Sequence, residues 1–329
     1  MMLQSLGRRW RWLLWLLLLP ILAGWMDLSV AAPVTIRLGI GGASAENLQL
    51  LLARPDLTPN QNKAYRLDYT RFEGTDKRFQ AFEAGALDIA LMNANGALFA
   101  AGEGLPFKMI ASVARESPRG ANVNFMVLDG SPIHSVKDVK GKTFGVVSLS
   151  SNTELQIRVM LEKNGMRERD VKLVPIPFPA MYEALKSGLV DVGSFPQPFL
   201  AMAKHSGGVR TIFTAKDAAP YEEELLILIA HDEFLKSNRA ATEAFLADLV
   251  AATKFYADHT HEARKALLDA KMVKIDPDVF YEMQDPYHEP SCRLDVEALA
   301  KMQALQVKAG FQKTSANLSQ YVDLSYLPK

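Results

Sequence analysis

A serine-rich turn holds the backbone and side-chain groups best suited to binding a ligand. It follows the apolar segment 143–147, and Ser151 and Glu154 fit the S-x-x-E pattern of a helix capping box. This pattern predicts a helix after Ser151 whose first amides are unpaired and whose positive dipole end is exposed. Such an end binds anions, although an ordinary capped helix is the alternative interpretation. The candidate binding residues of this turn are Ser148, Ser150, Ser151, Asn152 and Thr153.

A glycine-rich turn near the start of the chain mirrors this arrangement. Residues 34–40 have strand character, and residues 47–53 carry the apolar side chains of a helix. Between them lie Gly41, Gly42 and Ala43, which join strand to helix as in a βα unit. Two helix N-termini could therefore face each other across a cleft.

Two further turns and one arginine complete the candidate site. Asn93 and Asn95 supply amide side chains after one predicted strand, and Pro196 and Gln197 lie in a stiff proline turn after another. Ordinary turn chemistry explains the asparagines equally well. Arg71 is a candidate counter-charge, although a solvated or acid-paired arginine is the more common situation.

No catalytic residue, cofactor or metal site is predicted. His259 and His261 are two residues apart, so they would diverge on a helix, and a solvated junction is the better interpretation. His288, Glu289 and Cys292 are too irregularly spaced to suggest a metal centre. The chain also lacks the G-x-S-x-G pattern of a hydrolase nucleophile.

A duplicated passage from helix to strand reveals how these turns are positioned. Gly85 and Asp88 in the first copy are matched at the same spacing by Gly188 and Asp191 in the second. Each copy has the pattern of an amphipathic helix that ends at a glycine, followed by a short apolar strand entered through aspartate. Two similar lobes follow from this repeat, and a ligand site is expected in the cleft between them.

Strand and helix signals alternate along the chain, which predicts an α/β fold. We expect lobe 1 to comprise residues 32–123 and 219–329 and lobe 2 to comprise residues 124–218, each a mixed sheet flanked by helices. The last part of the chain is helical, and its helices are expected to pack on lobe 1. One helical face is marked by Phe245, Leu249, Thr253 and Tyr256.

The first 31 residues have the features of a secretory signal peptide. Arg8, Arg9 and Arg11 precede an apolar run, and Ser29 and Ala31 suit cleavage before residue 32. An uncleaved anchor is the alternative, but the run is short for a membrane-spanning helix. We expect a periplasmic protein, exported by either the Sec or the twin-arginine route, and no lipid anchor.

The net charge and the cysteine content argue against several kinds of partner and site. Removal of the predicted leader leaves 34 basic and 36 acidic residues, a balance that argues against a nucleic-acid partner. Cys292 is the single cysteine, so intramolecular disulfides and thiolate metal clusters are excluded. We expect a monomer.

The segments described above resemble a known family. From about residue 34 to the C-terminus the chain is similar to extracytoplasmic solute-binding proteins of ABC importers, in the nitrate/sulfonate/taurine-type group with the type II periplasmic binding fold. The resemblance is carried by residues 84–90, 133–142, 148–153, 188–191 with Pro196 and Pro198, and 321–327.

The resemblance implies a receptor whose two lobes close on a small anionic solute before it docks to a membrane permease. The family's binding positions would correspond to residues 41–43, 93–95, 148–153 and 196–197. The ligand would be a sulfonate, taurine or nitrate, or a carboxylate. Bicarbonate and neutral heterocycles also stay open, because each can use helix-end amides and amide side chains.

Two other functions remain as alternatives. Related folds include a pyrimidine-precursor synthase, but such enzymes depend on a cysteine-rich segment and a reactive histidine, and this chain has no cysteine cluster. The same fold also serves as a ligand-sensing module. That role would require a separate signalling partner, because the sequence contains no attached signalling domain.

Overall fold

The computed structural model describes residues 32–329 except Glu73 and Ser150. The predicted leader therefore lies outside the described residues. Within the described part of the chain, no helix is both long and apolar enough to cross a bilayer.

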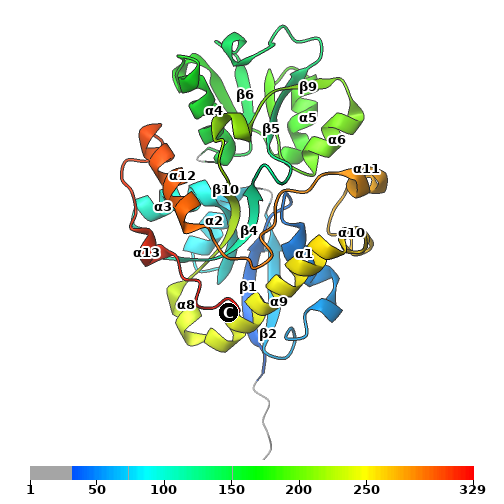
Figure 1. The fold of residues 1–329 in the computed structure, drawn as a ribbon, viewed down its shortest axis with the longest axis vertical. Helices are drawn as coiled ribbons and strands as arrows, with labels where there is room; N and C mark the ends of the chain where they lie inside the picture. The colour runs from blue at the N-terminus through cyan, green and yellow to red at the C-terminus, as the bar shows by residue number, and fades with distance from the viewer. Residues whose placement is uncertain (1–31, 73, 150) are drawn as a thin grey trace, which may run out of the picture. The chain divides into compact units, whose positions relative to one another are not determined.

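The first of two five-stranded sheets has the strand order β2-β1-β3-β10-β4 (Figure 1). Strand β1 runs parallel to β2 and β3, whereas β10 is antiparallel to β3 and β4. The helices that follow its first three strands are α1, α2 and α3. The bounds are β1 Val34–Ile40, α1 Glu46–Ala53, β2 Tyr65–Arg71, α2 Thr75–Glu83, β3 Ile89–Asn93, α3 Ala94–Gly102, β4 Lys108–Glu116 and β10 Glu223–Ala230.

The second sheet repeats the plan with the order β7-β6-β8-β5-β9. Strand β6 is parallel to β7 and β8, and β5 is antiparallel to β8 and β9. The fold prediction, two mixed sheets flanked by helices, is confirmed. The bounds are β5 Asn124–Leu128, β6 Thr143–Val146, α4 Asn152–Lys163, β7 Lys172–Pro175, α5 Phe178–Lys186, β8 Val192–Phe195, α6 Phe199–Ser206, β9 Val209–Thr214 and α7 Ala215–Ala218.

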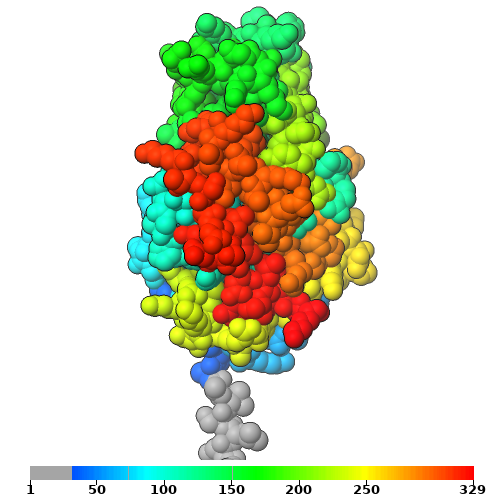
Figure 2. Space-filling view, turned by 60° about the vertical axis from the view of Figure 1, so that its left-hand side comes forward, coloured from blue at the N-terminus to red at the C-terminus, as the bar shows by residue number. Residues whose placement is uncertain are grey.

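The C-terminal helices cover the first sheet and also reach the second. On α9, the predicted face of Phe245, Leu249, Thr253 and Tyr256 is at most 2% exposed, and its apolar members share a core with α1. Phe311, just after α12, packs in the core of the second sheet, and Figure 2 shows the orange-to-red segment meeting the green one. The bounds are α8 Asp232–Ser237, α9 Arg239–Asp258, α10 Thr260–Asp269, α11 Pro277–Glu282, α12 Val296–Lys308 and α13 Leu318–Tyr321.

The duplicated Gly and Asp positions have the same structural role in both sheets. Gly85 and Gly188 adopt φ angles of 71° and 74°, in the left-handed region that glycine tolerates. The Asp88 carboxylate accepts the Arg37 amide at 2.8 Å, and that of Asp191 accepts the Thr143 amide at 2.8 Å. Each aspartate therefore ties the start of one strand to its parallel neighbour. The repeat explains the fold rather than a ligand contact.

The chain crosses between the sheets twice, after β4 and after β9, and buried acids gather at these crossings. Glu116 accepts the Val123 amide on both carboxylate oxygens, at 3.2 and 3.3 Å. Lys216 Nζ lies 3.2 Å from the Glu116 carbonyl oxygen and 3.7 Å from Glu223 Oε2. Burial raises the pKa of Glu116 to about 8 and that of Glu223 to about 7, with Lys216 opposing the shift. The folded protein therefore binds protons that the unfolded chain would release.

We predict that replacing either repeated glycine destabilises the protein. Gly85→Ala or Gly188→Ala should each lower the free energy of unfolding by about 1–2 kcal/mol, because a Cβ disfavours the left-handed conformation. Gly130→Ala is the control, since a Cβ there also meets no atom within 4 Å but the φ angle is not positive. Denaturant unfolding measures the difference. A control as destabilising as Gly188→Ala would contradict the assignment.

A pH dependence of stability follows from the crossing carboxylates. A carboxyl whose folded-state pKa lies above its unfolded value stabilises the fold fully at low pH and loses that contribution as pH rises toward the folded pKa. The melting temperature should therefore fall between pH 5 and 8, and Glu116→Gln should reduce that fall by about 2–4 °C, the effect of about 1 kcal/mol.

Glu222→Gln is the control for this measurement. Despite partial burial, hydrogen bonds from Ser117 and Arg119 lower the pKa of Glu222, so its titration lies below this pH range. An equal change in both variants would show that the buried position of Glu116 is not the cause.

Candidate ligand-binding cleft

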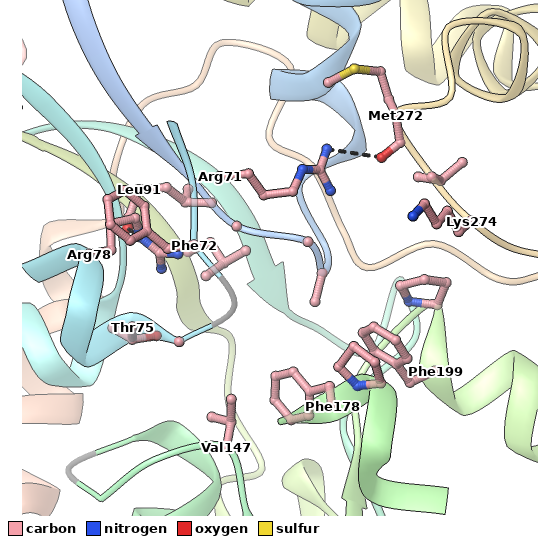
Figure 3. Close-up of a pocket in the computed structure, with 18 of the residues that line it drawn as sticks. Arg71, Phe72, Thr75, Arg78, Leu91, Val147, Phe178, Phe199, Met272 and Lys274 are labelled. Atoms are coloured by element: carbon pink, nitrogen blue, oxygen red, sulfur yellow. Dashed lines mark hydrogen bonds between the residues drawn. The ribbon is translucent and has the colours of Figure 1, made fainter. Parts of the chain in front are cut away.

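A cavity of about 500 Å³ lies between segments that belong to the two sheets (Figure 3). From the first-sheet side it is lined by residues 41–43, by residues that follow β2, and by residues 271–274 after α10. From the second-sheet side it is lined by Val147, by the start of α5 and by the start of α6. A smaller hollow of about 70 Å³ shares Ala43, Val147 and Phe178 with it and extends the cleft toward the start of α4.

The start of α4 lies at this smaller hollow, as Ser151, Asn152 and Thr153 all line it. Ser151 is the N-cap, because its Oγ accepts the Glu154 amide at 3.4 Å, but the Glu154 carboxylate accepts from Arg158. The Ser151 half of the predicted capping box is thus confirmed. The Asn152 Oδ1 atom is buried and has no hydrogen-bond partner among the described residues.

The structure does not place the other two serines of this turn, Ser148 and Ser150, at the cleft. Ser148 is buried with no described partner for its hydroxyl, but it lines neither hollow of the cleft. Ser150 lies outside the described residues.

The glycine turn after β1 lines the cavity, but the first turn of the helix that follows it does not. Gly41, Gly42 and Ala43 form part of the wall. Helix α1 begins at Glu46, which is 2% exposed, and no residue of its first turn lines either hollow of the cleft. The sequence suggested that the N-termini of two helices could face each other across the cleft. Of these two helices, only α4 has its N-terminus at the cleft.

Of the amide candidates, Asn93 lines the cleft and Asn95 does not. Asn93 is the N-cap of α3, where its Oδ1 accepts the Gly96 amide at 2.6 Å, and its side chain lines the smaller hollow. Asn95 is 1% exposed, and its Oδ1 accepts from Gln306 Nε2 at 2.6 Å. Asn95 therefore anchors α12 instead of a ligand.

The proline turn is divided between the cleft and a separate hollow. Pro196 and Pro198 line the cleft. Gln197 lines a separate hollow of about 510 Å³, where its Nε2 donates to the Gln284 carbonyl at 2.8 Å and its Oε1 accepts the Ala201 amide at 3.1 Å. The structure thus uses Gln197 to join the start of α6 to the segment after α11.

Arg71 lines the cavity at the end of β2, although its side chain is engaged locally. It is exposed, and its Nη2 donates to the Met272 carbonyl at 2.9 Å, as the dashed line in Figure 3 shows. This one hydrogen bond to a described residue uses one of the five N–H donors of the guanidinium.

Arg78 on α2 is a buried cation of the cavity wall that was not predicted from the sequence. It is 4% exposed, lines the cavity, and donates from Nε to the Leu91 carbonyl and from Nη1 to the Ile40 carbonyl at 3.4 Å. No described carboxylate forms an ion pair with it. Burial lowers its pKa to about 10, so it stays charged at neutral pH. Its spacing of four residues from the buried Phe82 could have placed it on the inward face of α2.

The cavity wall combines positive charge with apolar surface. Arg71, Arg78, Lys271 and Lys274 line it, and none of the lining residues that the structure describes is acidic; Glu73, between Phe72 and Gly74, lies outside them. A low-dielectric cleft with cations of one sign attracts anions. The apolar part is formed by Phe72, Leu91, Val147, Phe178, Phe199, Met202, Leu226, Met272 and Val273.

The groups expected of a catalytic or metal centre are placed elsewhere. Cys292 is fully buried against Thr253, and burial raises the pKa of its thiol to about 12, which makes it a poor nucleophile. In the described ranges, no group of three or more His, Cys, Asp or Glu side chains is arranged to hold a metal ion.

Comparison with known proteins finds relatives in sequence and solved structures with a similar fold. An Escherichia coli (strain K12) protein that carries the provisional name of an aliphatic sulfonates-binding protein is 24% identical over 69% of this chain and 70% of its own length. Among solved structures, the alkanesulfonate-binding protein SsuA from Xanthomonas axonopodis pv. citri, bound to MOPS, has a TM-score of 0.73 at 17% identity, covering 89% of this chain and 99% of that one.

The same fold also occurs in an enzyme. The desulfurization enzyme DSZB has a TM-score of 0.64 at 13% identity, covering 89% of this chain and 97% of its own. The family model described as NMT1/THI5 like matches residues 66–263, which is more than half of the chain. The chain therefore belongs to the NMT1/THI5-like family, with the fold of the periplasmic binding proteins.

Proposed function

We propose that this protein is the extracytoplasmic substrate-binding component of an ABC importer. It captures a small organic or inorganic anion, such as a sulfonate, taurine, nitrate or a carboxylate, and presents it to a membrane permease. The observation that carries the proposal is Arg78, a buried guanidinium on the cavity wall with no described carboxylate partner. A buried charge is costly unless it is paired, so a bound anion would complete this site.

The proposed mechanism is closure of two lobes on the ligand. Lobe 1 comprises residues 32–123 and 219–329, lobe 2 comprises residues 124–218, and the mature monomer begins near residue 32 after export to the periplasm. An anion held by Arg78 from one side and by the start of α4 from the other stabilises the closed state by its differential affinity. A ligand that touches one lobe alone would not shift the equilibrium.

A thermal-shift screen tests this function. The purified protein is measured with sulfonates, taurine, nitrate, bicarbonate and carboxylates, together with neutral analogues. A true ligand raises the melting temperature in proportion to the logarithm of its excess over Kd. Turnover of a bound compound by the purified protein would favour an enzyme instead.

We predict that Arg78→Gln weakens anion binding by about 10–100-fold. The variant removes a charge-assisted hydrogen bond of about 1.5–3 kcal/mol, and each 1.4 kcal/mol is a tenfold change in Kd. Arg78→Lys, which keeps the charge, should lose less, and Arg71→Gln should also lose less because that side chain is exposed. Calorimetry gives the Kd values, and melting curves without ligand establish that the variants are folded. A Kd for Arg78→Gln within twofold of wild type would contradict the assignment.

The start of α4 gives a separate prediction. The double variant Ser151→Ala with Asn152→Ala should weaken binding by at least fivefold while the protein stays folded, since loss of an N-cap costs about 0.5–2 kcal/mol of stability. Ser135→Ala removes another N-cap serine, one that lines neither hollow of the cleft, and is the matched control. Equal affinities in the double variant and wild type would remove α4 from the site.

A further inference from the structure

We propose that the ligand is an organic anion with an aromatic body, bound through a single carboxylate or sulfonate group. The inference rests on the proposed function and concerns only the class of substrate that the cleft selects.

The size of the cavity is the first argument. Its volume of about 500 Å³ lies within the range of about 300–1,000 Å³ for sites that enclose larger organic ligands. An inorganic anion is closer in size to a water molecule, which takes about 30 Å³ in the liquid. Such an ion would leave most of the apolar wall in contact with water. Its binding would therefore gain little from burial of apolar surface.

The chemistry of the wall is the second argument. The rings of Phe178 and Phe199 are stacked at a centroid distance of 5.9 Å with an interplanar angle of 28°, and together they form an aromatic surface on the second-sheet side. Phe72 lines the cavity from the first-sheet side, and Figure 3 shows rings contributed from both sides. Aromatic rings pack favourably against other rings and against thioethers, and Met202 and Met272 supply the latter.

The position of charge is the third argument. Arg78 is buried, whereas Arg71, Lys271 and Lys274 are exposed. One buried guanidinium matches one buried anionic group, and its planar fork suits the paired oxygens of a carboxylate or sulfonate. The three exposed cations add attraction for an approaching anion without requiring a second negative group in the interior.

Calorimetry with matched ligands tests the inference on the purified protein. The aromatic probes are benzoate, a naphthoate and a naphthalenesulfonate, and their alkyl counterparts are cyclohexanecarboxylate, decanoate and decanesulfonate. Nitrate, methanesulfonate and taurine represent small anions, and naphthamide is the neutral control. We expect the best aromatic anion to bind at least tenfold more tightly than its alkyl counterpart and than every small anion. The neutral amide should bind at least tenfold more weakly than the naphthoate.

The possible results separate this inference from the proposed function. If a small or alkyl anion binds as tightly as the aromatic ones, the aromatic class is wrong and anion capture stands. If naphthamide binds as well as the naphthoate, the anionic requirement is wrong. If no anion binds, both proposals fail.

Variants of the aromatic wall provide a second test. Phe178→Leu and Phe199→Leu should each reduce the preference for an aromatic over an alkyl anion by about 3–10-fold, which corresponds to the energy of one aromatic pair. Phe255→Leu is the control, because Phe255 is a half-buried ring on α9 that does not line the cleft. If the preference is the same in all three variants and in wild type, the aromatic wall does not contact the ligand.

Discussion

The first sheet buries the guanidinium of Arg78 without placing a described carboxylate against it. Among the described residues Arg78 donates to two backbone carbonyls, those of Leu91 and Ile40, which hold the guanidinium at the cavity wall but do not neutralise its charge. The ion pairs of other arginines show the contrast, since Arg264 is equally buried and is bound to Asp285 at 2.7 Å. A charge held in this way favours an anion as the missing partner. The carbonyls belong to β1 and β3, so the core of the first sheet positions the proposed binding group.

The proposed closure also requires that the opposite wall of the cleft can move relative to the wall that holds Arg78. The sheets are joined through two short crossings, and the acids there are buried with one lysine between them. The separate cores of the two halves allow each to stay intact while the crossings adjust. Phe311 and α12 add a contact from the C-terminal segment to the second sheet, and the proposed closure would have to preserve or exchange that packing. The proposed closure therefore depends on the two cores and on a small number of connecting residues.

Local patterns allowed the fold to be predicted, whereas the site depended on contacts between distant segments. The repeated Gly and Asp positions and the alternating strands are visible in short windows, and the structure has them where the pattern indicates. Asn95 resembled a ligand residue because its partner, Gln306, lies 211 residues away in the sequence. Gln197 also resembled a ligand residue, because its partner, the Gln284 carbonyl, lies 87 residues away in the sequence. Arg78 was overlooked because its role depends on carbonyls of two strands, although its spacing from Phe82 already indicated an inward position.

A crystal structure of the protein with its tightest-binding anion is the most direct test of this account. We expect the anionic oxygens to lie within hydrogen-bond distance of Arg78 and, on the other side, of the first residues of α4, with the ligand enclosed between the two sheets. An anion bound elsewhere, or held only by exposed lysines while the Arg78 guanidinium contacts no ligand atom, would contradict the central claim.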